Sequence, residues 1–306
     1  MRGRGVLHTP AMSMPPPTRR RTPLTSVVTV LRLMARNRAG FVGFLVVVVI
    51  VVGSFIAPLV VPFDASGSAA AIYATPSWAH PLGTDYEGRD VLAQVLRGGI
   101  DVIVVGFLSA LISTVIAVGL GALSAFVGGR VDWLITGVAD VVLTIPQLVL
   151  FIMLAGIFSL SSTWELALLL GALSWPYLLR AVRSQVLSLK ERDYVEAARA
   201  LDLGTRHIIS SELLPNMMSY IVINFVLGAI NAIYVAVALT FLGLVPLSGS
   251  NWGVMLNLAW VRGAVYLPNA LPYILGPTAA IALLTFCLVL TLRSLEEVFN
   301  PRLVEG

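Results

Sequence analysis

Few side chains in this sequence could carry out catalysis or hold a metal ion. The only lysine, Lys190, follows Ser-Gln-Val-Leu-Ser-Leu, so the chain lacks the Gly-x-x-x-x-Gly-Lys loop that cradles nucleotide phosphates. The three histidines, His8, His80 and His207, fall in a tail and two separate loops, where they cannot converge on one metal or form a Ser-His-Asp arrangement. A single cysteine, Cys287, excludes an internal disulfide. We therefore predict no catalysis, and no metal or cofactor bound by this chain.

The composition explains this shortage. Of 306 residues, 58% are apolar and 12% are charged, and the mean hydropathy is +0.90. A soluble domain carries about 25% charged residues, so a soluble enzyme is excluded. A helix needs about 20 mostly apolar residues to cross a bilayer. Six stretches qualify, which predicts an all-α integral membrane protein with six transmembrane helices, at 41–61, 102–126, 134–158, 160–179, 217–243 and 271–292.

The basic residues predict the orientation of these helices. Seventeen lysines and arginines fall in the segments that would share one side with both termini, against three (Arg89, Arg97 and Arg262) on the other side. Positive residues favour the cytoplasm, so both termini are expected there and the protein in the cell membrane. Because the net charge of +4 is explained in this way, nucleic-acid binding is not expected. The predicted divisions are a basic, proline-rich tail and lead-in (1–40), a first helix (41–61), an external loop (62–101), a core (102–292) and a cytoplasmic tail (293–306).

Polar residues inside the predicted helices are candidates for lining a solute path. Asp140 is costly at a bilayer centre, by about 2.5–3.5 kcal/mol, so it should face protein or water. Gln147 lies seven residues further on, near the same face and beside Pro146, which can kink the helix. Asn224 and Asn231 are also seven residues apart. Each set could line a path or form hydrogen bonds between helices, and the residues leave both alternatives open.

Small residues recur every four positions in the second predicted helix, and such stripes let helix backbones approach closely in lipid. The stripe either packs inside the bundle or forms an interface with a second subunit. Its members are Ser109, Ser113, Ala117, Gly121 and Ala125.

The loop at 190–216 is the longest one predicted for the cytoplasmic side. Asp193 is expected to cap a helix that begins at Tyr194, Gly204 to end that helix in a left-handed conformation, and Pro215 to end a second short helix. The loop could lie on lipid headgroups or dock against another protein. Its alanines and glutamate are poor membrane anchors, which favours docking.

Glu196-Ala197-Ala198, followed by Leu214-Pro215, resembles the EAA loop of ABC-importer permeases, through which the membrane subunits contact the ATPase. Asp202 stands where that family usually has glycine, and Gly204 is expected to take over the turn. Three further segments resemble the C-type subunits of dipeptide/oligopeptide permeases, and the likeness covers roughly residues 30–306. They are His80-Pro81-Leu82-Gly83-Thr84-Asp85 with Gly88-Arg89-Asp90, Phe241-Leu242-Gly243-Leu244, and Trp252-Gly253-Val254-Met255-Leu256.

The resemblance implies half of the translocation pathway of a peptide importer, with a second homologous permease, two ABC ATPase subunits that bind ATP and Mg, and an extracytoplasmic solute-binding protein as partners. It also implies that the ATPase contacts Glu196, Ala197, Ala198, Asp202, Gly204, Leu214 and Pro215. Nickel or another small solute is an alternative cargo. An ion-coupled secondary transporter and a non-transporting scaffold are alternatives from other classes, but the sequence shows no internal duplication of the kind common in secondary transporters.

Overall fold

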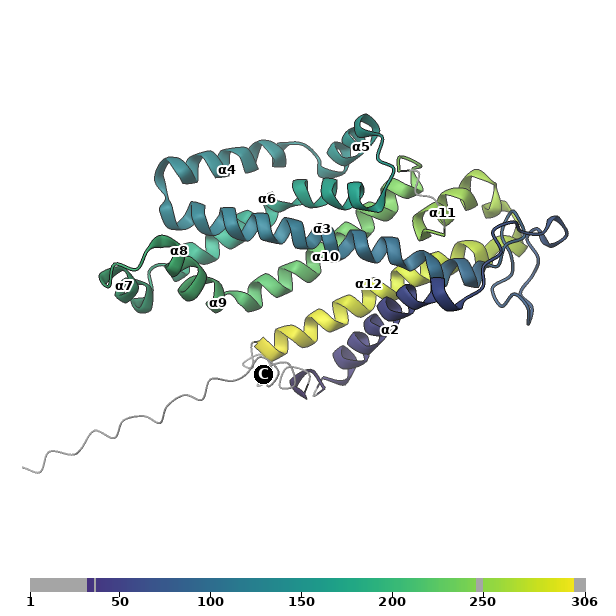
Figure 1. The fold of residues 1–306 in the computed structure, drawn as a ribbon, viewed down its shortest axis with the longest axis horizontal. Coiled ribbons are helices and arrows are strands. Elements are labelled where there is room, and N and C mark those ends of the chain that lie inside the picture. The colour runs from purple at the N-terminus through teal and green to yellow at the C-terminus, as the bar shows by residue number, and fades with distance from the viewer. Residues whose placement is uncertain (1–31, 36, 246–249, 300–306) are drawn as a thin grey trace, which may run out of the picture.

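The computed structural model describes residues 32–35, 37–245 and 250–299, and all regular elements in these ranges are helical. Most of the predicted basic tail and residues 300–306 lie outside the described residues. Five helices are long and apolar enough to cross a membrane, and they stand side by side as an elongated bundle (Figure 1). They are α2 (Arg38–Val60), α3 (Val91–Val127), α6 (Thr163–Leu189), α10 (Met218–Phe241) and α12 (Leu271–Phe299).

The predicted helix at 134–158 is not continuous. It consists of α4 (Gly129–Thr144) and α5 (Gln147–Phe158), which meet at an angle of 85°. Pro146 immediately precedes α5 and has no N–H to donate to the preceding turn, so the chain changes direction there. The described residues thus hold five spans, or six when the bent pair counts as one, and the protein is a multi-pass all-α membrane protein.

Two helices are longer than their predicted apolar runs, and local capping signals set where both of them begin. The second predicted helix begins at Val91 rather than 102, because the Asp90 carboxylate caps it by accepting a hydrogen bond from the Ala93 N–H at 2.7 Å. The fourth begins at Thr163 behind a capping box formed by Ser162 and Glu165, and continues to Leu189. As a result α3 has 37 residues and is about 55 Å long, which is more than a bilayer core requires.

Helix α3 lies at the centre of the bundle, between α6 and α10, whereas α2 packs along α12 (Figure 1). The close approach of α2 to α12 depends on glycine: a Cβ on Gly40 would lie 2.3 Å from the Ser294 Cβ, and one on Gly43 would lie 2.7 Å from the Leu290 Cβ. Helices this close gain van der Waals contact along their length.

The two ends of the bundle differ in character. At one end, the start of α2 meets the end of α12, where the Asn37 amide donates a hydrogen bond to the Glu297 carboxylate at 2.7 Å. The four short helices of the 190–216 loop lie at this same end (Figure 1). The opposite end carries the segment 61–90 together with α11 (Trp252–Val261) and the 3₁₀ turns η1 (Ala69–Ala71), η3 (Ala264–Tyr266) and η4 (Pro268–Ala270). That the first of these ends faces the cytoplasm stays a prediction.

Candidate functional site

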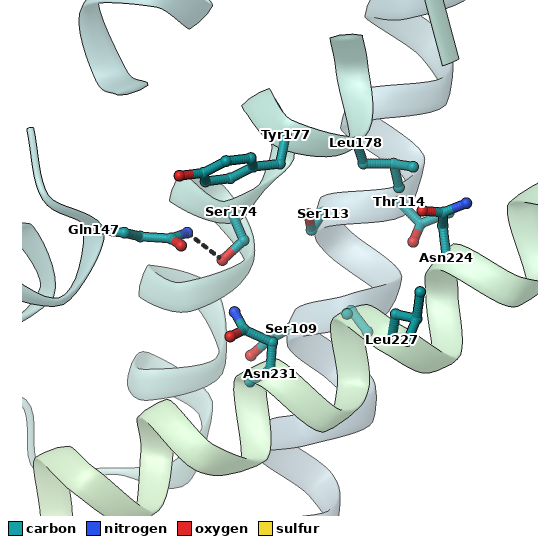
Figure 2. Close-up of a pocket in the computed structure, with 13 residues that line it drawn as sticks. Ser109, Ser113, Thr114, Gln147, Ser174, Tyr177, Leu178, Asn224, Leu227 and Asn231 are labelled. Atoms are coloured by element: carbon teal, nitrogen blue, oxygen red, sulfur yellow. Dashed lines mark hydrogen bonds between the residues drawn. The ribbon is translucent and has the colours of Figure 1, made fainter. Parts of the chain in front are cut away.

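A cavity of about 470 Å³ opens between α3, α5, α6 and α10 (Figure 2). Three of the four residues predicted to line a solute path, Gln147, Asn224 and Asn231, border it. No lining side chain is an acid, a lysine, an arginine or a histidine. The other polar side chains that line the cavity were not predicted to do so from the sequence, and they are Ser109, Ser113, Thr114, Ser174 and Tyr177.

The side-chain amides that line this cavity form few hydrogen bonds to the protein. Gln147 reaches from α5 toward α6 and donates a 3.3 Å hydrogen bond to the Ser174 hydroxyl (Figure 2). Asn224 donates only to the Tyr220 carbonyl of its own helix, at 2.9 Å, and Asn231 is exposed. Within the described part of the chain, neither asparagine forms a hydrogen bond to another helix. Both amides can therefore bond to a solute or to water in the cavity.

Asp140 lies apart from this cavity. Its carboxylate accepts a 2.6 Å contact from the Arg180 guanidinium of α6, and both side chains are more than half exposed. The expectation that Asp140 and Gln147 share a face was wrong, because the 85° bend separates α4 from α5. A seven-residue spacing places two side chains on one face only if the helix is continuous.

The stripe of small residues lies on the side of α3 that packs against α6. Ser109, Ala117 and Ala125 are nearly fully buried, and the Ser109 hydroxyl donates to the Ala167 carbonyl at 3.1 Å. A Cβ on Gly121 would lie 3.0 Å from the Leu179 carbonyl oxygen. Of the two alternatives for the stripe, its described contacts correspond to packing inside the bundle. Ser109 and Ser113 also border the cavity.

The 190–216 loop folds into four short helical pieces: α7 (Asp193–Ala200), α8 (Thr205–His207), the π-helical η2 (Ile208–Leu213) and α9 (Leu214–Asn216). One side of this unit is buried against the bundle. Val195, Ala198, Ile208 and Leu213 pack there with residues of α3 and α6, among them Ala122, Ala125, Val182 and Val186. The Arg199 guanidinium lies 5.0 Å from the centre of the Phe126 ring, which adds a cation–π contact.

The other side of the unit faces away from the bundle. Glu196 and Ala197 are exposed on α7, and Leu201, directly after it, is 73% exposed. The seven residues assigned to ATPase contact therefore divide into two groups. Glu196, Ala197, Asp202, Gly204 and Pro215 are exposed, whereas Ala198 is buried and Leu214 half-buried.

Three details of this loop differ from the sequence predictions. Arg192, not Asp193, occupies the N-cap of α7, and no side chain caps that helix. Asp202 has φ +52° and ends α7 in a Schellman arrangement in which the Leu203 N–H donates to the Ala198 carbonyl. Gly204, expected to take the left-handed position, is extended. Asp tolerates this conformation because its short polar side chain can bond locally.

Pro215 does not end the second helical stretch. Helical backbone continues through Leu214 to Asn216, and the preceding turn is π-helical, with the Leu214 N–H donating to the Ile209 carbonyl. A π turn has wider spacing than an α turn, so it accommodates the proline ring, which would otherwise clash with the carbonyl four residues earlier.

A model of one protein family matches residues 117–305, which include the 190–216 loop and three of the four helices around the cavity, α5, α6 and α10. Its description is binding-protein-dependent transport system inner membrane component. The chain belongs to this family. It is therefore a component of a transport system, located in the membrane.

Several individual permeases are similar in sequence to this chain over most of its length. A putative peptide permease protein of Brucella suis is 33% identical over 269 residues, which is 87% of this chain and 88% of the relative. The oligopeptide transport system permease protein OppC of Mycobacterium tuberculosis is 30% identical over 276 residues, covering 89% and 93% of the two chains. The dipeptide transport system permease protein DppC of Haemophilus influenzae is 29% identical over 278 residues, covering 88% and 92%.

In this permease, the side chains of the His80–Asp90 motif form hydrogen bonds with one another and hold the segment 61–90 together. The Asp85 carboxylate is fully buried and accepts hydrogen bonds from Arg89 Nε at 2.8 Å, from Gln94 Nε2 at 2.9 Å, and from two backbone N–H groups. His80 Nδ1 lies 2.8 Å from Asp90 Oδ2, and Asp90 in turn caps α3. These side chains satisfy one another and join the segment to the start of α3.

The same permease segment also packs against the last two helical regions. The guanidinium groups of Arg89 and Arg262 both contact the Tyr86 ring, at 5.1 and 4.9 Å from its centre, and the Tyr273 ring of α12 lies 6.4 Å from it, centre to centre. Burial and the nearby Asp85 carboxylate raise the pKa of the Tyr73 hydroxyl above its ordinary value. Thus the motif has a structural explanation, and nothing about it requires contact with a solute.

Proposed function

We propose that this chain is the membrane subunit of an ATP-driven importer of peptides and forms one half of its translocation pathway. Three relatives of almost the same length carry peptide, oligopeptide or dipeptide permease names, which supports this cargo over nickel. The cavity chemistry also suits a peptide. Amide and hydroxyl side chains can donate to and accept from backbone amides of any sequence, and they impose no charge requirement on the cargo.

The power for import has to come from other chains. The sequence contains no phosphate-binding Gly-x-x-x-x-Gly-Lys loop, so ATP and Mg are assigned to two partner ATPase subunits. The exposed face of α7, with Glu196, Ala197 and the neighbouring Leu201, is the proposed contact surface for one of them. A second permease, a solute-binding protein outside the membrane and the surrounding lipid complete the proposed set of partners.

One observation carries the mechanical part of the proposal. The buried side of the 190–216 loop packs on Val182 and Val186 of α6, and the same helix contributes Ser174 and Tyr177 to the cavity, about one and a half to three turns away. Packed interiors transmit displacement because they contain few voids. A push by the ATPases on the loop would therefore move α6, and with it one wall of the cavity.

Replacement of Glu196 with arginine tests the docking surface. The side chain is exposed and forms no hydrogen bond within the described residues, so the fold should tolerate the change. We expect ATPase subunits to be lost from the purified complex while membrane insertion stays normal. The matched control is Glu191→Arg, an exposed glutamate just before α7 that should leave ATPase binding unchanged. Full transport by the Glu196→Arg variant contradicts the proposal.

The driving force is tested separately, with intact cells and labelled peptide. Depletion of ATP should stop uptake, whereas an ionophore applied with ATP preserved should leave uptake intact. The reverse result would favour an ion-coupled secondary transporter.

A further inference from the structure

Helix α6 has an exposed face that is polar where a lipid-facing helix is apolar. Between residues 173 and 189, every exposed side chain of α6 is polar, and the set is Tyr177, Arg180, Ser184, Gln185 and Ser188. Helix α2 is the opposite case, since every exposed side chain from Val42 to Val60 is apolar. The mean hydropathy of the best window in α6 is 1.3, the lowest of the five spans, against 2.8 in α2.

The polar face begins inside the cavity. Ser174 and Tyr177 border the cavity, and Arg180, Ser184 and Ser188 follow at intervals of three or four residues, which keeps them on one face of the helix. The face therefore runs without interruption from the cavity to the end of the bundle that carries the 190–216 loop. Exposed polar and charged side chains at this depth require water or a polar partner, because hydrocarbon offers them no hydrogen bonds.

Two Asp–Arg pairs join α4 to α6, and they differ in kind. Asp132 and Arg183 form a two-point contact at 2.7 and 2.6 Å, and the Ser124 hydroxyl also donates to Asp132. Asp140 and Arg180 share a single 2.6 Å contact, with 58% and 55% of their side chains exposed. Within the described residues, the side chains of Asp140 and Arg180 form no other hydrogen bond. The Asp132–Arg183 pair uses its donors and acceptors within the fold, whereas the exposed Asp140–Arg180 pair retains donors and an acceptor that can bond to water or a solute.

We infer that the polar face of α6 is the wall of a water-filled inner vestibule that continues the pathway, and that the Asp140–Arg180 pair keeps this vestibule electrically balanced. One cation and one anion side by side favour neither sign at a distance, so peptides of either net charge can pass. The cavity between α3, α5, α6 and α10 has no charged lining side chain, so it also favours neither sign of charge. This inference rests on the proposed function for its cargo, but the open polar face can be tested without any cargo.

Cysteine labelling tests the vestibule in membrane vesicles that contain the complete transporter. In a Cys287→Ala background, single cysteines replace Tyr177, Ser184 or Ser188, and the control is Val49→Cys on the apolar face of α2. Tyr177 lies about 18 Å from the C-terminal end of α6 and Val49 about 17 Å from the N-terminal end of α2, and both of these helix ends lie on the side of the 190–216 loop, so Val49 matches Tyr177 in depth. Charged, membrane-impermeant methanethiosulfonates are added from the side of the 190–216 loop. We expect the cysteine at 177 to react about tenfold faster than this control, and the cysteines at 184 and 188, which lie nearer the helix end, to react at least as fast as the one at 177. Equal rates would mean that lipid or a dry subunit interface covers the face, and would overturn the inference.

The charge balance is tested with the Ser184→Cys protein, since position 184 lies one turn from Arg180. The measured quantity is the ratio of the reaction rates of a trimethylammonium and a sulfonate reagent. Asp140→Asn should shift this ratio about threefold or more toward the anionic reagent, and Arg180→Gln should shift it in the opposite direction. The control, Arg130→Gln at the start of α4, should leave the ratio unchanged. Absence of opposite shifts would overturn the role of the pair.

The two proposals fail in different ways. The labelling needs neither ATP nor an identified peptide. An accessible α6 face in a protein that binds no ATPase would contradict the proposed function and leave the vestibule intact. A sealed α6 face in a protein that retains its ATPases would contradict the vestibule alone.

Discussion

Arg183 on α6 holds Asp132 on α4 through two parallel contacts, from Nε to Oδ1 at 2.7 Å and from Nη2 to Oδ2 at 2.6 Å. Because both donors come from one planar guanidinium, the pair fixes the orientation of the two helices as well as their separation. The contact lies near the turn that joins α3 to α4, where the Ser124 hydroxyl of α3 also bonds to Asp132. Three helices thus meet at one carboxylate.

Substitution of Arg183 by lysine should weaken this junction. Lysine keeps the charge but presents no fork, so one contact is lost and the pair loses its orientation. We expect the free energy of unfolding to fall by about 1–2 kcal/mol, measured as a lower Tm in detergent. Arg180→Lys is the matched control, since its single exposed contact should change stability by less than about 0.5 kcal/mol. Equal losses in the two variants would contradict the assignment.

Asp85 should be essential for the segment 61–90. Its carboxylate is fully buried and bonded to Arg89, Gln94 and two backbone N–H groups. Asp85→Asn removes the charge opposite Arg89 and replaces one acceptor by a donor, at a cost of about 3 kcal/mol. We expect rapid proteolysis of this segment in the variant. Glu87→Gln removes an exposed partner of the same arginine and should have almost no effect.

Gly171 should not tolerate alanine. The added Cβ would lie 2.7 Å from the Ile112 Cβ and 3.1 Å from the Ser109 carbonyl oxygen, so α6 would have to move away from α3. Because Ser109 borders the cavity, transport as well as stability should fall. Gly137→Ala in α4 meets open space and should be neutral or stabilising by up to about 1 kcal/mol, since alanine favours helix. A harmless Gly171→Ala would disprove the close approach of α3 and α6.

The turn after α7 predicts opposite results at two neighbouring positions. Asp202 adopts φ +52°, so Asp202→Gly should stabilise the loop by about 1 kcal/mol and Asp202→Val should destabilise it by a similar amount. Gly204 is extended, with open space around it, so Gly204→Ala should be tolerated. The thermal unfolding of the three variants measures this directly. Sensitivity at Gly204 combined with tolerance at Asp202 would mean that the turn has been assigned to the wrong residue.

Asn231→Leu should impair transport without impairing the fold. The amide is exposed, borders the cavity and forms no hydrogen bond within the described residues, so its loss leaves no buried group unpaired. We expect the peptide transport rate to fall severalfold at an unchanged Tm. Thr278→Val is the control, because it removes an exposed polar atom from α12, away from the cavity. Unchanged transport by Asn231→Leu would remove Asn231 from the proposed pathway.

Much of the architecture could be predicted from sequence because lipid is a demanding solvent. Each spanning segment has to be apolar and has to satisfy its own backbone, so hydropathy alone located the spans and Pro146 marked where one of them breaks. The loop at 190–216 was equally visible, since a long polar segment between apolar runs cannot lie in hydrocarbon. Ends of helices were less accurate, because capping by Asp90 and Ser162 depends on single side chains.

Tertiary structure decided the relations between segments. The sequence by itself determined that this chain is a bundle of apolar helices with a polar helical loop and few groups capable of chemistry. Only the fold separated Asp140 from Gln147, because the size of a proline bend depends on what each half packs against. Only the fold brought Gln147, Ser174 and Asn231 around one cavity, since they come from three helices whose spacing is set by small residues at their contacts. It also buried Asp85 and left Asp140 exposed. The identity of a residue states what it can bond to, whereas its partners are decided by the helices that pack around it.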